Sequence, residues 1–210
     1  MTSTAPFASR FSTAKRVTAL TGAGLLTAVG LAFAVPTSAS AATYTCNGKV
    51  ATIVGTEGAD EIEGTRGDDV IVGLGGNDEI DGNGGNDTIC GNAGNDEIDG
   101  GSGNDWLQGG TGNDEIDGDT GNDRVYGSSG HDDLEGGSGN DVVDGYSGND
   151  QLEGGSGNDT LRGDAGNDLL EGNSGSDKLS GGAGSDITRQ GSASDSVEDR
   201  WERQYRGDDD

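Results

Sequence analysis

Fifteen aspartates recur at a fixed spacing of nine residues, and no other side chains in this sequence are arranged so clearly for chemistry. They are Asp60, Asp69, Asp78, Asp87, Asp96, Asp105, Asp114, Asp123, Asp132, Asp141, Asp150, Asp159, Asp168, Asp177 and Asp186. Carboxylates stacked in a row repel one another, whereas a divalent cation between them makes the interaction attractive. Carboxylate and carbonyl oxygens are the hard ligands that Ca²⁺ prefers, at roughly six to eight per ion. The spacing therefore predicts a series of calcium sites.

The aspartates belong to a nine-residue unit that repeats fifteen times, from Gly55 to Arg189, without insertion or deletion. We number the copies one to fifteen and the places within each copy one to nine. Glycine fills the first and fourth places of every copy, and aspartate fills the sixth. An aliphatic residue fills the eighth place from Ile62 to Leu179, and Thr188 stands there in the last copy. Such strict places indicate a repeated structural element.

Each unit reads as a turn followed by a very short strand. Its first six residues are rich in Gly, Asn, Ser and Asp, which favour turns. The last three, such as Glu115-Ile116-Asp117, alternate polar and apolar, so one side chain points inward. Two units make one coil of eighteen residues, which places odd copies in one sheet and even copies in the other. Neighbouring strands within a sheet then lie about 4.8 Å apart. Stacked sixth-place carboxylates then repel by roughly 3.5 kcal/mol at an effective dielectric of 20.

The unit resembles the nonapeptide of RTX (repeats-in-toxin) proteins, G-G-x-G-x-D-x-U-x with U aliphatic. The resemblance covers fifteen copies of nine residues, 135 of 210 in all. It implies an all-β, parallel β-roll with two short-stranded sheets, in which Asp and loop carbonyls of copies i and i+2 share Ca²⁺. Fifteen copies allow at most thirteen such pairs. The alternative is a disordered Gly/Asp-rich polymer, which we expect of the metal-free chain but which does not explain the aliphatic eighth place.

The first 41 residues have the pattern of a secretory signal peptide. Basic residues precede the apolar run from Val17 to Val35, and Ala39-Ser40-Ala41 fits the small-x-small cleavage rule. We predict cleavage after Ala41, which leaves a secreted, extracellular chain with no membrane span. An uncleaved membrane anchor is the alternative.

Short segments flank the repeats. Residues 42–54 are predicted to form an N-terminal capping strand, because Ile53 falls on an eighth place when the register is counted backwards. Residues 190–210 are predicted to form a C-terminal cap or tail. There Val197, Trp201 and Tyr205 follow one another at four-residue spacing, which favours a short amphipathic helix over the last coil; a disordered tail is the alternative. The predicted organisation is thus a signal peptide (1–41), a capping strand (42–54), a roll (55–189) and a cap (190–210).

Cys46 and Cys90 are the only cysteines. An even count in a secreted chain suggests a disulfide. Cys90 is the ninth residue of copy four and points outward, so a bridge is reasonable if the capping segment folds back over the even sheet. Two free thiols are the alternative.

The outward residues of the two sheets differ in character. The odd face comprises Glu61, Glu63, Glu79, Asp81, Glu97, Asp99, Glu115, Asp117, Asp133, Glu135, Gln151, Glu153, Leu169, Glu171, Ile187 and Arg189, of which twelve of sixteen are acidic. The even face comprises Val70, Val72, Thr88, Cys90, Trp106, Gln108, Arg124, Tyr126, Val142, Asp144, Thr160, Arg162, Lys178 and Ser180, of which one of fourteen is acidic. The even face, centred on Trp106 and Tyr126, is the candidate surface for a cell-surface glycan or protein. The alternative is that residues 42–54 simply cover part of it.

Charge and composition narrow the function. A net charge of −27 makes nucleic acid an implausible partner. His131, the single histidine, takes a fifth place where ten other copies carry Asn, so it reads as a turn residue and not as a base or zinc ligand. We predict a secreted calcium-binding protein that folds on binding several Ca²⁺ and is not an enzyme. The alternatives are an extracellular adhesion or matrix module that uses the even face and, with less support, a fragment of an RTX enzyme or toxin.

Overall fold

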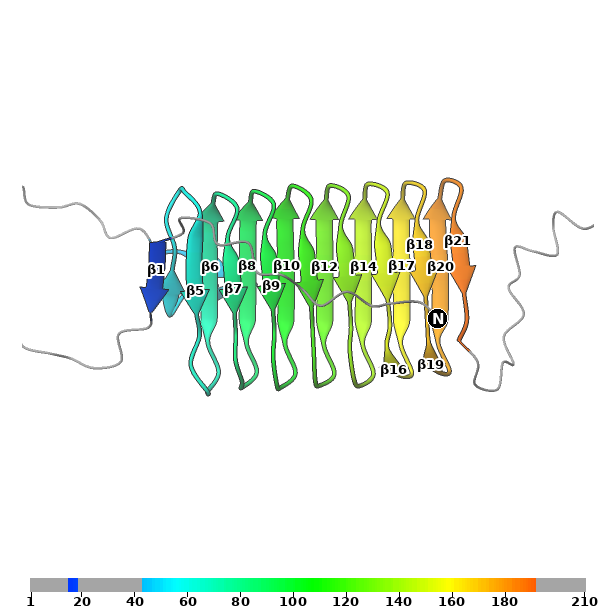
Figure 1. Ribbon diagram of the computed structural model, residues 1–210, viewed down its shortest axis with the longest axis horizontal. Coiled ribbons are helices and arrows are strands. Elements are labelled where there is room, and N and C mark those ends of the chain that lie inside the picture. The colour runs from blue at the N-terminus through cyan, green and yellow to red at the C-terminus, as the bar shows by residue number, and fades with distance from the viewer. Residues whose placement is uncertain (1–14, 19–42, 192–210) are drawn as a thin grey trace, which may run out of the picture.

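The computed structural model describes residues 15–18 and 43–191, and it shows an elongated roll of stacked coils (Figure 1). Every regular element in these ranges is a β-strand, which confirms the predicted all-β parallel roll. None of the described residues forms a helix that is long and apolar enough to cross a membrane.

The strands of the odd copies form a nine-stranded parallel sheet. Their registers pair residues eighteen positions apart, as in Ile98↔Ile116, so two nonapeptides make one coil as predicted. β1 pairs with β5 at the N-terminal edge and lies within the segment that the sequence predicts to be a signal peptide. In sheet order the strands are β1 (Lys15–Thr18), β5 (Asp60–Glu63), β7 (Glu79–Asp81), β9 (Glu97–Asp99), β11 (Glu115–Asp117), β13 (Asp133–Glu135), β15 (Gln151–Glu153), β18 (Leu169–Glu171) and β21 (Ile187–Arg189).

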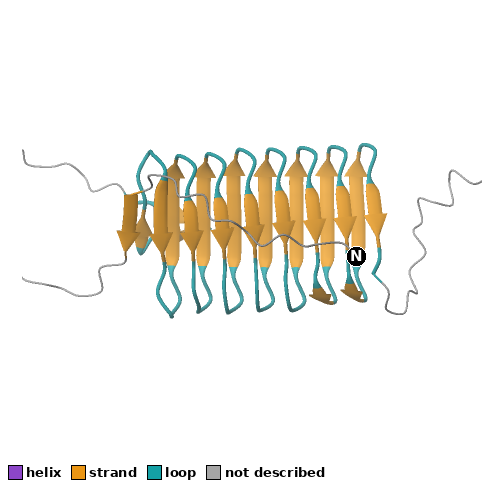
Figure 2. Ribbon diagram, viewed as in Figure 1, coloured by secondary structure: helices purple, strands orange, loops and turns teal. Residues whose placement is uncertain are grey.

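The strands of the even copies form an eight-stranded parallel sheet behind the first (Figure 2). In sheet order they are β20 (Lys178–Ala183), β17 (Thr160–Ala165), β14 (Val142–Ser147), β12 (Arg124–Ser129), β10 (Trp106–Thr111), β8 (Thr88–Ala93), β6 (Val70–Gly75) and β4 (Ile53–Val54). All but β4 have six residues, so the predicted three-residue length is wrong for this sheet. Each long strand runs on into the first residues of the following copy. The second residue of that copy has a left-handed φ, as at Ser128 (83°), and still pairs with the neighbouring strand, as in Gly110↔Ser128. Gly, Asn, Asp and Ser commonly fill that place, and the first three tolerate this conformation best.

The turns that precede the even strands carry short β-pairings of their own. β16 (Ser156–Gly157) and β19 (Ser174–Gly175) form a two-stranded parallel sheet in the turns that precede even strands. Single bridges continue this line towards the N-terminus, as in Ser102↔Thr120. The two rows of turns are therefore not alike, although both are built from the same six places.

The core between the sheets is one line of aliphatic side chains. The eighth-place residues from Ile62 to Leu170 are buried, and Leu179 packs against them at the C-terminal end. Ile53 belongs to the same cluster with 6 % of its surface exposed, and β4 pairs with β6. Residues 53–54 therefore continue the repeat register beyond copy one, as the eighth-place count predicts.

The N-terminal capping segment is a hairpin followed by a short strand, not a single strand. β2 (Thr45–Cys46) and β3 (Lys49–Val50) pair antiparallel around Asn47 and Gly48, whose φ angles are 47° and 74°. An Asn-Gly pair with two positive φ angles forms the two-residue turn typical of β-hairpins. That dipeptide is a signal from which the hairpin could have been predicted.

The hairpin lies over the first strands of the eight-stranded sheet. Cys46 and Cys90, the chain's only cysteines, form a disulfide with 5.8 Å between their Cα atoms. These residues and Val72 form a second buried cluster. Partly buried hydrophobic residues pack against it, namely Ala51, Val70, Leu74 and Trp106. The hairpin therefore covers the N-terminal part of the even face, and Trp106 lies at its margin.

Two sequence predictions fall outside the described residues. These are the amphipathic helix through Val197, Trp201 and Tyr205 and the cleavage site at Ala41.

Candidate metal centre

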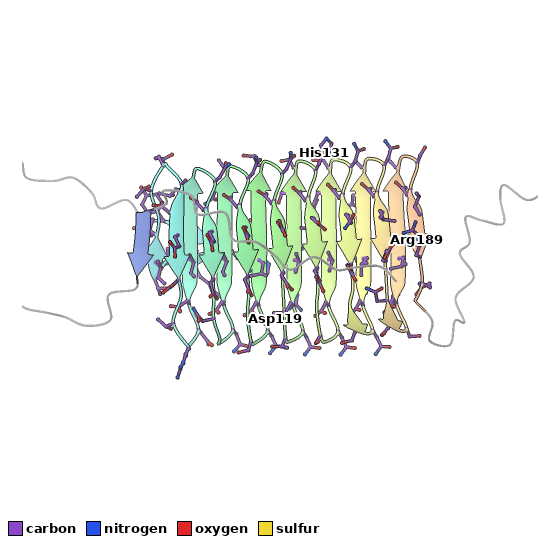
Figure 3. All side chains as sticks on the ribbon, in the orientation of Figure 1. Asp119, His131 and Arg189 are labelled. Carbon is purple, nitrogen blue, oxygen red and sulfur yellow. A yellow bond between two sulfur atoms is a disulfide. The ribbon has the colours of Figure 1, made fainter. Side chains whose placement is uncertain are left out.

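The sixth-place aspartates lie in two rows of turns at opposite edges of the roll. Figure 3 labels one residue in each row, His131 and Asp119. Aspartates of odd copies lie in one row and those of even copies in the other, because each coil has one turn of each kind. From Asp60 to Asp177 all fourteen are only 1–7 % exposed, and Asp186 in the last copy is partly exposed.

Within each row a hydrogen bond joins successive aspartates. The backbone amide of Asp105 donates to Oδ1 of Asp123 at 2.8 Å, and the amide of Asp123 donates to Oδ1 of Asp141 at 2.8 Å. The same bond recurs from Asp60 to the last pair, Asp168 to Asp186 at 3.1 Å. The structure therefore brings together the carboxylates of copies i and i+2, and it uses one oxygen of each to hold the next coil.

The second oxygen of most of these carboxylates has no donor. Thirteen buried carboxylate oxygens in the described part of the chain lack a hydrogen-bond partner. They are Oδ1 of Asp60 and Oδ2 of Asp78, Asp87, Asp96, Asp105, Asp114, Asp123, Asp132, Asp141, Asp150, Asp159, Asp168 and Asp177. An unsatisfied buried acceptor costs about 1–3 kcal/mol, and more when it is charged. A cation in each turn would supply the missing partner.

The rest of the turn fits a hard cation held largely by backbone. A Cβ on Gly109 would lie 2.2 Å from Oδ2 of Asp114, so the first-place glycine leaves the room that the carboxylate fills. Across residues 15–18 and 43–191, no three His, Cys, Asp or Glu side chains converge on one point. The donors to an ion would therefore be one or two carboxylates together with turn carbonyls. Such an all-oxygen set suits Ca²⁺ and does not suit Zn²⁺, which prefers Cys and His.

Burial disfavours the charged form of these carboxyl groups. It raises the pKa of Asp87, Asp114 and Asp123 to about 7, and neighbouring carboxylates of the same row raise the pKa further. The pKa is raised to about 6, again chiefly by burial, at Asp78, Asp105, Asp132 and Asp159. Without a metal the folded roll therefore binds protons that the unfolded chain releases near neutral pH.

Acid is expected to fold the metal-free chain. A carboxyl whose pKa is higher in the folded state stabilises that state below its unfolded pKa, near 3.8, and the stabilisation is lost as pH rises through 6 to 7. The metal-free chain should therefore gain sheet structure when the pH falls from 8 to about 5. Circular dichroism in metal-depleted buffer measures this gain. A sheet signal that stays flat or falls over this range would contradict it.

In the first turn of each row, a threonine donates hydrogen bonds to the sixth-place aspartate. Oδ2 of Asp60 accepts hydrogen bonds from the amide and hydroxyl of Thr56 at 2.6 and 2.8 Å. Oδ2 of Asp69 accepts the same pair from Thr65 at 2.7 and 2.8 Å. Threonine fills the second place only in these two copies. Oδ2 of Asp60 and of Asp69, both predicted as metal ligands, thus has protein donors, whereas Oδ2 of the aspartates from Asp78 to Asp177 has none. Oδ1 of Asp60 still lacks a donor. The second-place threonines were the signal for these hydrogen bonds.

Fifth-place side chains form a second ladder on the outside of the turns. Oδ1 of Asn104 accepts the amide and side-chain nitrogens of Asn122 at 2.9 and 3.0 Å. His131 keeps the pattern, since its Nδ1 accepts the amide of Asn149 at 2.8 Å. His131 is therefore a turn residue, as predicted. The asparagine ladder itself was missed, although ten asparagines at one place were its signal.

Comparisons with known proteins agree with this geometry. A family model described as the RTX calcium-binding nonapeptide repeat (4 copies) matches residues 54–89, 90–125, 126–161 and 153–188. Together these ranges run from residue 54 to residue 188, which is well over half of the chain. A search of curated proteins finds no match. Repeats of this kind bind Ca²⁺ at their turns, so the turns of this roll are calcium sites.

Proposed function

We propose, from the premise that the chain belongs to the family of RTX calcium-binding nonapeptide-repeat proteins, that it is secreted and folds as Ca²⁺ fills its turns. The observation that carries the proposal is the set of buried carboxylate oxygens without a donor. Bound calcium supplies positive charge at those oxygens. The chain's own residues do the rest, because the aspartates hold one coil to the next through Oδ1 while the eighth-place side chains exclude water.

Secretion matches the chemistry of the sites. The apolar run and the small-x-small sequence before Ala42 support export. Calcium sites of extracellular modules commonly have dissociation constants of about 10⁻⁴–10⁻³ M, so such sites fill only outside the cell. The chain would cross the membrane unfolded and acquire its roll afterwards. On this proposal the protein has no catalytic role, since the repeat residues are accounted for by turns, core and metal.

The proposal is tested on the chain recovered from the culture medium of producing cells. Intact mass should place its first residue at Ala42, and limited proteolysis should leave the roll intact with Ca²⁺ and degrade it with chelator. A variant that combines Ala39→Lys with Ala41→Lys is the control and should stay with the cell membrane, uncleaved. A wild-type chain retained in the cell with residues 1–41 attached would overturn secretion.

A second candidate function is extracellular attachment through the even face. The hairpin covers only the first strands of this face, and Trp106 lies at the margin of the covered part. Tyr126 and its neighbours stay uncovered by the residues described. Twelve acidic residues keep the odd face solvated, whereas the even face holds one. This difference favours the even face as the contact surface of an adhesion or matrix module.

A further inference from the structure

Three aromatic side chains cross the eight-stranded sheet as a diagonal stripe. Trp106 lies on β10, Tyr126 on β12 and Tyr146 on β14, which are adjacent strands (Figure 1). Each aromatic residue is twenty positions after the last, which is one coil plus two residues on the same face of the strand. Ring centroids are 5.3 Å apart in the first pair and 6.2 Å in the second, and the rings are tilted by 47° and 46°. We call these three residues the aromatic stripe.

Tyr146 is an unusual residue for the left-handed conformation that the second place of the repeat adopts. Its φ is 70°, in the left-handed region that bulky side chains rarely enter. Leu74 takes the same place on β6 with φ of 81°, but it packs against the buried cluster under the hairpin. Tyr146 has no such core to fill: it is 46 % exposed, and its ring contact is with Tyr126. A strained conformation that presents an aromatic ring to solvent points to a binding role.

Charge on the even face restricts the kind of partner. On the strands around the stripe Asp144 is paired with Arg162 at 3.2 Å, and the other charged residues are Arg124, Lys178 and Asp164, so this surface is close to neutral. A cationic partner would be drawn to the twelve carboxylates of the odd face, and a polyanion would be repelled by a net charge of −27. The stripe therefore complements an uncharged partner.

Polar groups beside the rings complete the surface. Gln108 lies two residues after Trp106, and its side-chain nitrogen donates to the hydroxyl of Ser128 at 3.0 Å. Ser128 in turn lies two residues after Tyr126 and pairs with Tyr146 in the ladder. Flat aromatic faces with amide and hydroxyl groups alongside match a ligand that has apolar faces and hydroxyl edges.

We propose that the aromatic stripe binds an uncharged polysaccharide, whose sugar rings stack on Trp106, Tyr126 and Tyr146 while Gln108 and Ser128 hydrogen-bond its hydroxyls. This inference rests on the second candidate function, attachment through the even face, and supplies its ligand class. The diagonal runs from the first outward residue of β10 to the last outward residue of β14, so the sugar chain lies obliquely across the strands.

The test measures retention of the calcium-loaded mature chain on microcrystalline cellulose and on chitin. The wild type should be retained, and the double variant Trp106→Ala/Tyr146→Ala should lose at least about tenfold in affinity. Tyr44→Ala is the matched control, since Tyr44 is 39 % exposed and lies off the stripe; it should bind as the wild type does. Gln108→Ala should weaken binding less than the double variant.

Two readings separate this inference from calcium binding itself. Calcium-induced sheet signal should be equal in the wild type and the double variant, because neither side chain lies in the roll's core. A wild type that folds with Ca²⁺ but is retained on neither polysaccharide overturns the inference and leaves the calcium roll standing. Loss of self-association in the double variant, measured by sedimentation without any change in retention, also overturns it and assigns the stripe to a second copy.

Discussion

Removing Ca²⁺ from the mature chain is expected to unfold most of the roll. Thirteen buried carboxylate oxygens in two rows of turns then lack donors, and burial disfavours their charge. When the free Ca²⁺ concentration is a hundred times a site's dissociation constant, that site adds about 2.7 kcal/mol to the free energy of unfolding. Six such sites together outweigh the roughly 5–15 kcal/mol that holds an ordinary domain folded. Circular dichroism should show the sheet signal vanish with chelator and return with Ca²⁺.

Magnesium is the control for this experiment. Mg²⁺ demands near-octahedral geometry and keeps much of its water, so it should not restore the signal at the same concentration. An unchanged sheet signal and melting temperature in chelator would contradict the metal requirement outright.

The loss of structure should spare the N-terminal end. There Thr56 and Thr65 donate to Oδ2 of Asp60 and Asp69, and the disulfide holds the hairpin to β8. Hydrogen exchange in chelator should leave protection only around residues 43–72 and around β8, to which the disulfide holds the hairpin. Thr65→Val should reduce that protection by about 1–3 kcal/mol, because it removes a donor to a buried carboxylate. Thr111→Val, at an exposed threonine, is the matched control.

Replacing Gly121 with alanine is expected to break the stack of coils. The residue has φ of 152°, and an added Cβ would lie 1.4 Å from the carbonyl oxygen of Gly103 in the coil before it. Left-handed strain and overpacking each cost about 1–3 kcal/mol, so the variant should lose roughly 2–6 kcal/mol. Coils contact only their neighbours, so the disruption separates the two halves of the roll. The calcium midpoint and melting temperature measure it.

Gly67→Ala is the matched control for that variant. Gly67 is also a fourth-place glycine, but it lies outside the left-handed region, and an added Cβ would have no heavy atom within 4 Å. It should change the melting temperature little. Equal losses in the two variants would show that close approach of the coils is not what fixes glycine at the fourth place.

The fold could be predicted from two places of the repeat. The eighth place fixes which side chains face inward, and the distance of two copies fixes which strands are neighbours, so even Ile53 could be assigned to the core. These properties follow from periodicity alone. The hard ligands of the metal followed from the sixth place in the same way, because side chains repeated in register must lie in rows.

Features that depend on backbone conformation at single residues were not predicted. The six-residue strands require a left-handed second place, which the sequence marks only by a mixture of Gly, Asn, Asp and Ser. Tyr146 departs from that mixture, and its ring contact with Tyr126 links places two and nine of different copies. For the aspartates from Asp78 to Asp177, the single oxygen without a donor depends on which amide reaches Oδ1, and periodicity does not specify this.

The turns in which Thr56 and Thr65 donate to an aspartate lie at the N-terminal end of the roll, so this end is expected to fold first. If the chain is exported from its N-terminal end, as we propose, residues 43–72 reach the outside first, and their two sixth-place aspartates already have hydroxyl donors. They present a finished edge to the next coil while the remainder of the chain is still in transit. On the proposed route each later turn needs only Ca²⁺ and one preceding coil, so folding proceeds from the N-terminal to the C-terminal end and opposes the return of the exported chain.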